Sequence, residues 1–191
     1  LRDLDAAYAD AEAAGVRALV LRGDGRAFCA GRDIAGVDPR DDDVIGFLGG
    51  LVAPVMRRMA RFPAPTFAAA HGACLGVGLG LLIATDVVYV AESARIGSPF
   101  AGLGAALDSG GHALFVERLG AHRALDLVYT GRMMSGVEAV AAGLFSRVLA
   151  ARPRICRETP RRTWGLTTEV VSHRAPSTRS YTSTIAAVRL D

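Results

Sequence analysis

The chain has 191 residues, a length that fits one domain, and 51% of them are hydrophobic, which is enough to bury a sizeable core. The net charge of +3 is unevenly spread: residues 1–150 hold 14 arginines and 16 acidic residues, whereas residues 151–191 hold 8 and 3. We therefore expect no nucleic-acid surface on the body of the chain, and no membrane span, because no apolar run reaches about 18 residues.

The first half of the chain alternates between helical and strand patterns. Apolar spacing predicts a helix over residues 1–15, and a short apolar strand follows over 16–23. After a glycine-punctuated loop, residues 41–62 have a helical pattern with acids at its start and arginines near its end, as the helix dipole favours. Gly49, Gly50 and Pro54 are expected to kink this helix. A buried strand is predicted over 65–72.

The second half continues the alternation. A glycine run leads into an apolar helix, and a strand follows over 86–92. The segment ARIGSP is expected to be a loop. Helical patterns cover 109–120, 121–131 and 135–143, and residues 144–149 form a last strand. Because strands alternate with helices, the fold class is predicted to be α/β.

The composition changes after about residue 150. Residues 151–191 contain 11 Ser and Thr residues, against 8 in the preceding 150, and only one glycine. We therefore divide the chain into a core over 1–150 and an atypical basic tail over 151–191 that is poorly ordered and protease-sensitive. The abrupt change is also compatible with a shifted reading frame.

Two loops that follow predicted strands suggest a site built from backbone N–H groups. They are AFCAGRDI, residues 27–34, and the run from His71 to Gly80, which leads into a helix. One N–H from each loop could bind an oxygen that becomes negative, and the start of a helix near Gly76 would add positive potential. Glycine would let a substrate approach the backbone, but it could equally serve close packing of helix on strand. A dinucleotide loop is disfavoured because GVGLG is one residue short of GxGxxG.

The chain resembles the enoyl-CoA hydratase/isomerase, or crotonase, superfamily over roughly residues 1–149. The segments that carry the resemblance are FCAGRDI, HGACLGVGLGLLIATDVVYVAE, SPFAGLGAALDSGGHALFVERLG and ALDLVYTGRMMSGVEAVAAGLFSRV. The resemblance implies a superhelix of repeated ββα units, here expected without the family's first strands and usual C-terminal helices. It also implies a cytoplasmic enzyme acting on an acyl-CoA thioester, with no cofactor beyond the substrate's own coenzyme A, and a homotrimer or a dimer of trimers.

By matched position, the resemblance assigns the two donors of an oxyanion hole to the N–H groups of Ala30 and Val77. These donors would stabilise the enolate that forms from the thioester. The resemblance implies substrate-binding positions at Ala27, Phe28, Ala30, Gly31, Arg32, Asp33, Gly76, Gly78 and Phe100.

Both glutamates of the family's hydratases are absent from the matching positions. Gly80 stands four residues after the first glycine of the oxyanion turn, and Phe100 follows the Gly97-Ser98-Pro99 turn. Addition of water to a double bond needs groups that activate the water and protonate carbon. The chain therefore does not resemble an ordinary two-glutamate hydratase.

Asp108 is the acid that remains in the matching segment. Several branches of the superfamily place a single aspartate here, including double-bond isomerases of the phenylacetate-pathway type. An isomerase needs one base, and burial would strengthen a carboxylate in that role by raising its pKa. Asp108 could also serve as an N-cap of the following helix. We predict an enoyl-CoA isomerase; the alternatives are a hydratase that uses Asp108 and a bound water, and a silent acyl-CoA-binding subunit.

The remaining polar candidates indicate structure more than chemistry. His71 and His112 are isolated, so no metal site is expected. Arg32 and Asp33 could form a loop salt bridge or contact coenzyme A. The three cysteines lack CxxC spacing, which argues against a disulfide framework and a zinc site, and two of them, Cys29 and Cys74, have the surroundings of small core residues.

Overall fold

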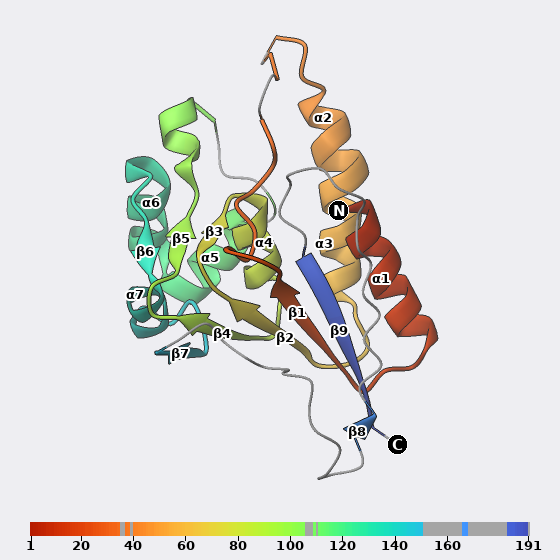
Figure 1. Cartoon of the computed structure of the whole chain (residues 1–191). Coiled ribbons are helices and arrows are strands. Elements are labelled where there is room, and N and C mark those ends of the chain that lie inside the picture. Colours follow the sequence, from red (N-terminus) through yellow and green to blue (C-terminus); the bar gives the residue numbers. More distant parts are fainter. Residues whose placement is uncertain are drawn as a thin grey trace.

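The computed structural model describes residues 1–34, 37–38, 40–105, 109, 111–150, 166–167 and 183–190, with the backbone alone for 111–112, 166–167 and 183–190. Two sheets form the centre of the fold (Figure 1). The larger sheet has the spatial order β7 (Arg147–Leu149), β4 (Val87–Ala91), β2 (Thr66–Ala70), β1 (Ala18–Gly23), β9 (Ser183–Leu190) and β8 (Leu166–Thr167). The smaller sheet has the order β3 (Ala73–Leu75), β5 (Arg95–Gly97) and β6 (Met134–Ser135).

In the larger sheet, neighbouring strands among β1, β2, β4 and β7 are parallel, as is typical of α/β folds. The described helices are α1 (Arg2–Ala13), α2 (Val44–Phe47), α3 (Ala53–Ala60), α4 (Val77–Ile83), α5 (Gly111–Leu119), α6 (Ala121–Thr130) and α7 (Gly136–Ala141). Two successive units, β2–β3–α4 and β4–β5–α5, place one strand in each sheet before a helix. The predicted α/β class and the repeated ββα unit are confirmed.

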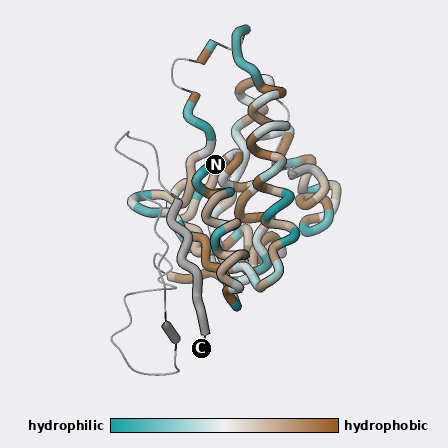
Figure 2. The backbone as a smooth tube through the Cα atoms, turned by 90° about the vertical axis from the view of Figure 1, so that its right-hand side faces the viewer, coloured by the Kyte–Doolittle hydropathy of each residue, from teal (hydrophilic) through white to brown (hydrophobic). Residues whose placement is uncertain are grey.

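Helix α4 lies in the centre of the molecule, and each of its seven residues is buried. It belongs to one hydrophobic core that also contains residues of both sheets and of α1, α3 and α5. Helix α1, which apolar spacing predicted, packs on α3 and buries Leu4, Ala7, Tyr8 and Ala11. Figure 2 shows the same amphipathic character as alternating hydrophobic and hydrophilic colour along the helices.

The residues predicted to kink the helix over 41–62 lie in or beside a π-helical turn. This turn, η1 (Leu48–Val52), contains Gly49 and Gly50 and separates α2 from α3. Pro54 lies at the start of α3, two residues after this turn. The helix end at Ala60, before Pro63 and Pro65, agrees with the proline stop signal.

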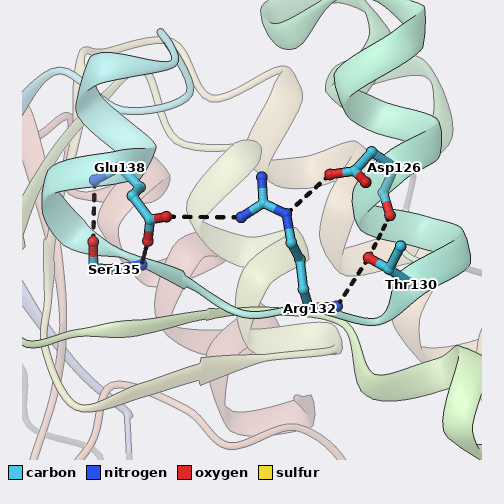
Figure 3. Close-up of polar contacts among 5 residues, drawn as sticks. All are labelled: Asp126, Thr130, Arg132, Ser135 and Glu138. Atoms are coloured by element: carbon cyan, nitrogen blue, oxygen red, sulfur yellow. Dashed lines mark hydrogen bonds and ion pairs between the residues drawn. The ribbon is translucent and has the colours of Figure 1, made fainter.

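Helix α7 is held by a capping box that joins it to α6 through one arginine (Figure 3). Ser135 accepts a hydrogen bond from the Glu138 N–H, and Glu138 accepts one from the Ser135 N–H. These contacts hold the pKa of Glu138 below its ordinary value. Arg132 pairs with Asp126 at 2.9 Å and with Glu138 at 3.8 Å, and the Thr130 hydroxyl donates to the Asp126 carbonyl. The network fixes the chain between the two helices.

Three short strands within residues 1–150 were not predicted from the sequence. They are β3 and β5, which follow strands of the larger sheet, and β6, whose two residues pair with β5. The predicted loop ARIGSP is wrong over its middle, because Arg95–Gly97 forms β5. Within the tail 151–191, the described backbone forms β8 and β9, and β9 pairs with β1 over six residues. The division into a core and a tail stays a prediction.

Candidate active site

The two loops predicted to share a site lie against each other. Cys29 and Cys74 form an isolated parallel bridge, in which the Cys29 N–H donates to the Ala73 carbonyl at 3.1 Å. The Leu75 N–H returns a bond to the Cys29 carbonyl at 3.0 Å, and Phe28 donates to His71 at 2.7 Å. These bonds bring the segment after β1 beside the segment between β2 and α4.

Glycines allow this close approach. A Cβ built at Gly78 would lie 2.7 Å from the Cβ of Cys29 and even closer to its carbonyl oxygen, so an alanine there would force the two loops apart. A Cβ at Gly31 would meet the Leu75 carbonyl at 3.2 Å, and Gly31 also has a φ of +103°. Close packing of the two loops is therefore one role of these glycines.

The Ala30 and Val77 N–H groups have no hydrogen-bond partner within the described part of the chain. Val77 is the first residue of α4, where an N–H has no partner inside the helix. Gly76 precedes it with a φ of +54°, and its own N–H donates to the Gly97 carbonyl at 3.2 Å. An oxyanion hole needs two unpaired donors that point at one oxygen, and Ala30 and Val77 offer unpaired donors on adjoining loops.

Phe100, at the position of a family glutamate, lies over the turn that begins α4. It is half-buried, and its ring edge would be 3.5 Å from a Cβ at Gly76. Its element is the 3-10 turn η2 (Pro99–Leu103), which follows β5. The ring makes this side of the turn apolar, and it carries no group that could transfer a proton.

Asp108, the predicted base, lies outside the described residues, but Ser109 directly follows it in the chain. Ser109 is buried and has a φ of +54°. A Cβ built at Gly80 would lie 2.6 Å from the Cβ of Ser109. The residue after Asp108 therefore contacts α4 one helical turn beyond the Gly76 cap, at the position of the other family glutamate.

Arg32 forms a salt bridge with Asp42, a partner that the sequence analysis did not name. Its guanidinium donates to both Asp42 carboxylate oxygens, at 2.7 and 2.8 Å, and stacks on the Phe47 ring with its central carbon 4.4 Å from the ring centroid. The hydrogen bonds from Arg32 hold the pKa of Asp42 below its ordinary value. The pair joins the loop that carries Ala30 to the start of α2. Binding of coenzyme A by Arg32 and Asp33 stays a prediction.

The two described cysteines are not poised for nucleophilic chemistry. Burial, together with the nearby Cys29, raises the pKa of the Cys74 thiol to about 12, and burial also raises that of Cys29. Both thiols are therefore protonated at neutral pH. Cys74 is fully buried, as expected of a small core residue. Among the residues that the structure describes, no group of three or more His, Cys, Asp or Glu could hold a metal ion.

Comparison with known proteins decides the family. The family model described as enoyl-CoA hydratase/isomerase matches residues 1–179. The chain belongs to the enoyl-CoA hydratase/isomerase family. A protein of Rhizobium meliloti named "Probable enoyl-CoA hydratase" is 39% identical over 155 residues, which are 78% of this chain and 58% of that protein. The 1,2-epoxyphenylacetyl-CoA isomerase of Escherichia coli is 34% identical over 138 residues, 70% of this chain and 53% of that protein.

Solved structures of the family confirm the crotonase fold. The enoyl-CoA hydratase of Bacillus anthracis superposes with a TM-score of 0.70 at 31% identity, covering 78% of this chain and 58% of that one. The chain therefore spans somewhat more than half of the length of these relatives. None of the helices in the described residues combines the length and apolar character of a membrane span.

Sequence reasoning identified the two loops and missed two contacts. One is the pairing of Arg32 with Asp42, and the other is the fit of Ser109 against Gly80. The glycine at position 80, where the family's hydratases have a glutamate, was the one sequence signal that another residue could occupy the space beside α4. The structure places Phe100 against Gly76 and Cys29 against Gly78, and the roles of Ala30, Val77 and the other positions named from the resemblance stay predictions.

Proposed function

We propose that the chain supplies the oxyanion hole and the base of an acyl-CoA enzyme, and that this enzyme is an enoyl-CoA double-bond isomerase. The observation that carries the proposal is the pair of unpaired N–H groups at Ala30 and Val77 on two adjoining loops. Gly80 and Phe100 replace both hydratase glutamates, and Asp108 is the acid at a position where several branches of the family place a single aspartate. The similarity to a relative named 1,2-epoxyphenylacetyl-CoA isomerase supports an isomerase.

In the proposed reaction, the Asp108 carboxylate takes a proton from the α-carbon of a 3-enoyl-CoA. The electrons of that C–H bond form a dienolate, whose negative charge rests on the thioester oxygen between the Ala30 and Val77 N–H groups. Asp108 then returns the proton to the γ-carbon, and the double bond moves to the 2,3-position. Atoms and electrons balance without a metal or a redox cofactor.

The Phe100 ring supports isomerisation over hydration. It covers the turn before Val77 with apolar surface, at a place where hydratases of the family carry a carboxylate. Water that is not positioned or activated adds slowly to the double bond. A hydratase that uses Asp108 and a bound water remains the second candidate, because the relative from Rhizobium meliloti is named a hydratase.

Asp108→Asn tests the proposal. The amide keeps the shape and much of the capping ability of the aspartate but cannot accept the proton, so we expect turnover of 3-enoyl-CoA thioesters to be abolished. Binding of acyl-CoA and thermal stability should change little. Spectrophotometric assays on a panel of 2-enoyl- and 3-enoyl-CoA thioesters, paired with calorimetric binding, measure both effects.

Two outcomes would contradict the proposal. Full activity of Asp108→Asn would leave Asp108 as a helix cap only. A wild-type chain that binds acyl-CoA and converts none of the panel would instead favour a silent binding subunit.

A further inference from the structure

The side of α4 that would carry catalytic side chains in a two-glutamate site is made of glycine here. Gly76 caps the helix and Gly80 lies one turn later, its N–H donating to the Gly76 carbonyl at 3.1 Å. Residues of the segment after β5 cover both glycines: the Phe100 ring at Gly76 and Ser109 at Gly80. The two glycines differ in what an added side chain would meet.

At Gly76 an added Cβ would be in ordinary contact with Phe100, at 3.5 Å. At Gly80 it would meet Ser109 at three atoms: Cβ at 2.6 Å, the carbonyl oxygen at 3.2 Å and Oγ at 3.4 Å. The shortest of these is closer than real Cβ atoms come to one another. Because Cβ and the carbonyl are fixed to the backbone, a change of rotamer at Ser109 cannot relieve the clash.

Ser109 is held in an unusual conformation at this contact. It is the one residue other than glycine with a positive φ in the described part of the chain, at +54°, and it is buried. Serine pays a steric cost in the left-handed region that glycine does not. The next two residues in the sequence are both glycine, yet the strained position carries a side chain. Such strain persists only where the surroundings fix the residue, and Ser109 lies close against Gly80.

We propose that Ser109 is a positioning residue that decides which segment supplies the proton-transferring carboxylate, because it fills the space that any side chain at position 80 would need. A glutamate at position 80 of α4 is thereby excluded, and the proposed function takes its acid from Asp108 instead. This inference rests on the proposed function for its chemistry, while the steric pair of Gly80 and Ser109 can be tested without substrate.

A double-mutant cycle tests the steric pair. The variants are Gly80→Ala, Ser109→Gly and both together, with Gly50→Ala as the matched control, because a Cβ at Gly50 meets nothing within 4 Å. We expect Gly80→Ala to lower Tm and to reduce isomerase kcat by at least about tenfold, and the double variant to recover most of both losses. If Gly80→Ala does not fold, recovery of folded protein in the double variant is the same positive result.

A second comparison tests whether Ser109 prevents a glutamate at position 80 from acting in the site. Gly80→Glu and Gly80→Glu/Ser109→Gly are assayed for hydration of 2-enoyl-CoA, a readout that a merely structural role of Ser109 would not move. We expect the double variant to hydrate at least about tenfold faster than the single one, because the glutamate can then enter the site.

Three results would overturn the inference: a Gly80→Ala variant that behaves like Gly50→Ala, a double variant that recovers nothing, or equal hydration by the two glutamate variants. A wild-type chain without any turnover would contradict the proposed function instead. In that case the Tm values of the cycle, which need no substrate, still decide whether Gly80 and Ser109 form a pair.

Discussion

Arg32 lies two residues after the proposed donor Ala30, and its contacts fix the loop at that point. Its guanidinium binds Asp42 through two hydrogen bonds and lies on Phe47, so the loop is tied to the residues that start α2. The side chains are partly buried, with 29% of Arg32 and 14% of Asp42 exposed. A bidentate, stacked pair of this kind holds one geometry better than an exposed pair does.

We expect Asp42→Asn to lower Tm at neutral pH, whereas Asp38→Asn, which breaks the exposed pair with Arg40, should leave Tm nearly unchanged. Because Arg32 lowers the pKa of Asp42 below 3.8, the folded state binds fewer protons there than the unfolded chain. The stabilisation is therefore complete above pH 3.8 and is lost as the pH falls through the lowered pKa. Thermal unfolding of wild type and both variants across this range measures the effect. A Tm difference for Asp42→Asn that does not shrink in acid would refute it.

Helix α4 is the element on which the site depends. Its first residue, Val77, offers an unpaired N–H, while its buried residues fix it between the two sheets. The sequence predicted this helix from its apolar run, and the family resemblance located the donor. The sequence did not predict the neighbouring strands β3 and β5, because segments of three residues are too short to show a period. Their pairing is set by contacts with segments far along the chain.

Val77→Pro removes one proposed donor with little cost to the helix, since proline is tolerated at the first helical position. We expect turnover to fall by roughly 100- to 1000-fold while acyl-CoA binding and Tm change little. Val77→Ala, which keeps the N–H and loses only side-chain packing, is the matched control. Steady-state kinetics with calorimetric binding separates the two effects. Retention of turnover by Val77→Pro would remove Val77 from the oxyanion hole.

At the scale of the whole molecule, the order of helices and strands along the chain could be predicted from the sequence better than the contacts between them. The α/β class and the helices followed from local patterns of apolar residues, glycine and proline. The fit of Ser109 against Gly80 joins residues 29 positions apart, and β9 pairs with a strand more than 150 residues earlier. No local pattern encodes such contacts, because they depend on how separate elements pack.

The pairing of β9 with β1 predicts an alternating pattern of hydrogen exchange. The Leu19 N–H donates to the Pro65 carbonyl, so it faces β2. Because the N–H groups of successive strand residues point to opposite sides, the Leu21 N–H also faces β2. The Val20 and Arg22 N–H groups then face β9, where they align with Ala186 and Thr184. Deletion of residues 183–191 should therefore speed exchange at Val20 and Arg22 by at least about tenfold and leave Leu19 and Leu21 protected.

Exchange of these four amides, followed by NMR in the whole and the shortened chain, measures the effect. Equal acceleration at all four would indicate general destabilisation, and no acceleration would show that β9 does not protect β1; either result refutes the pairing as a source of order in the sheet.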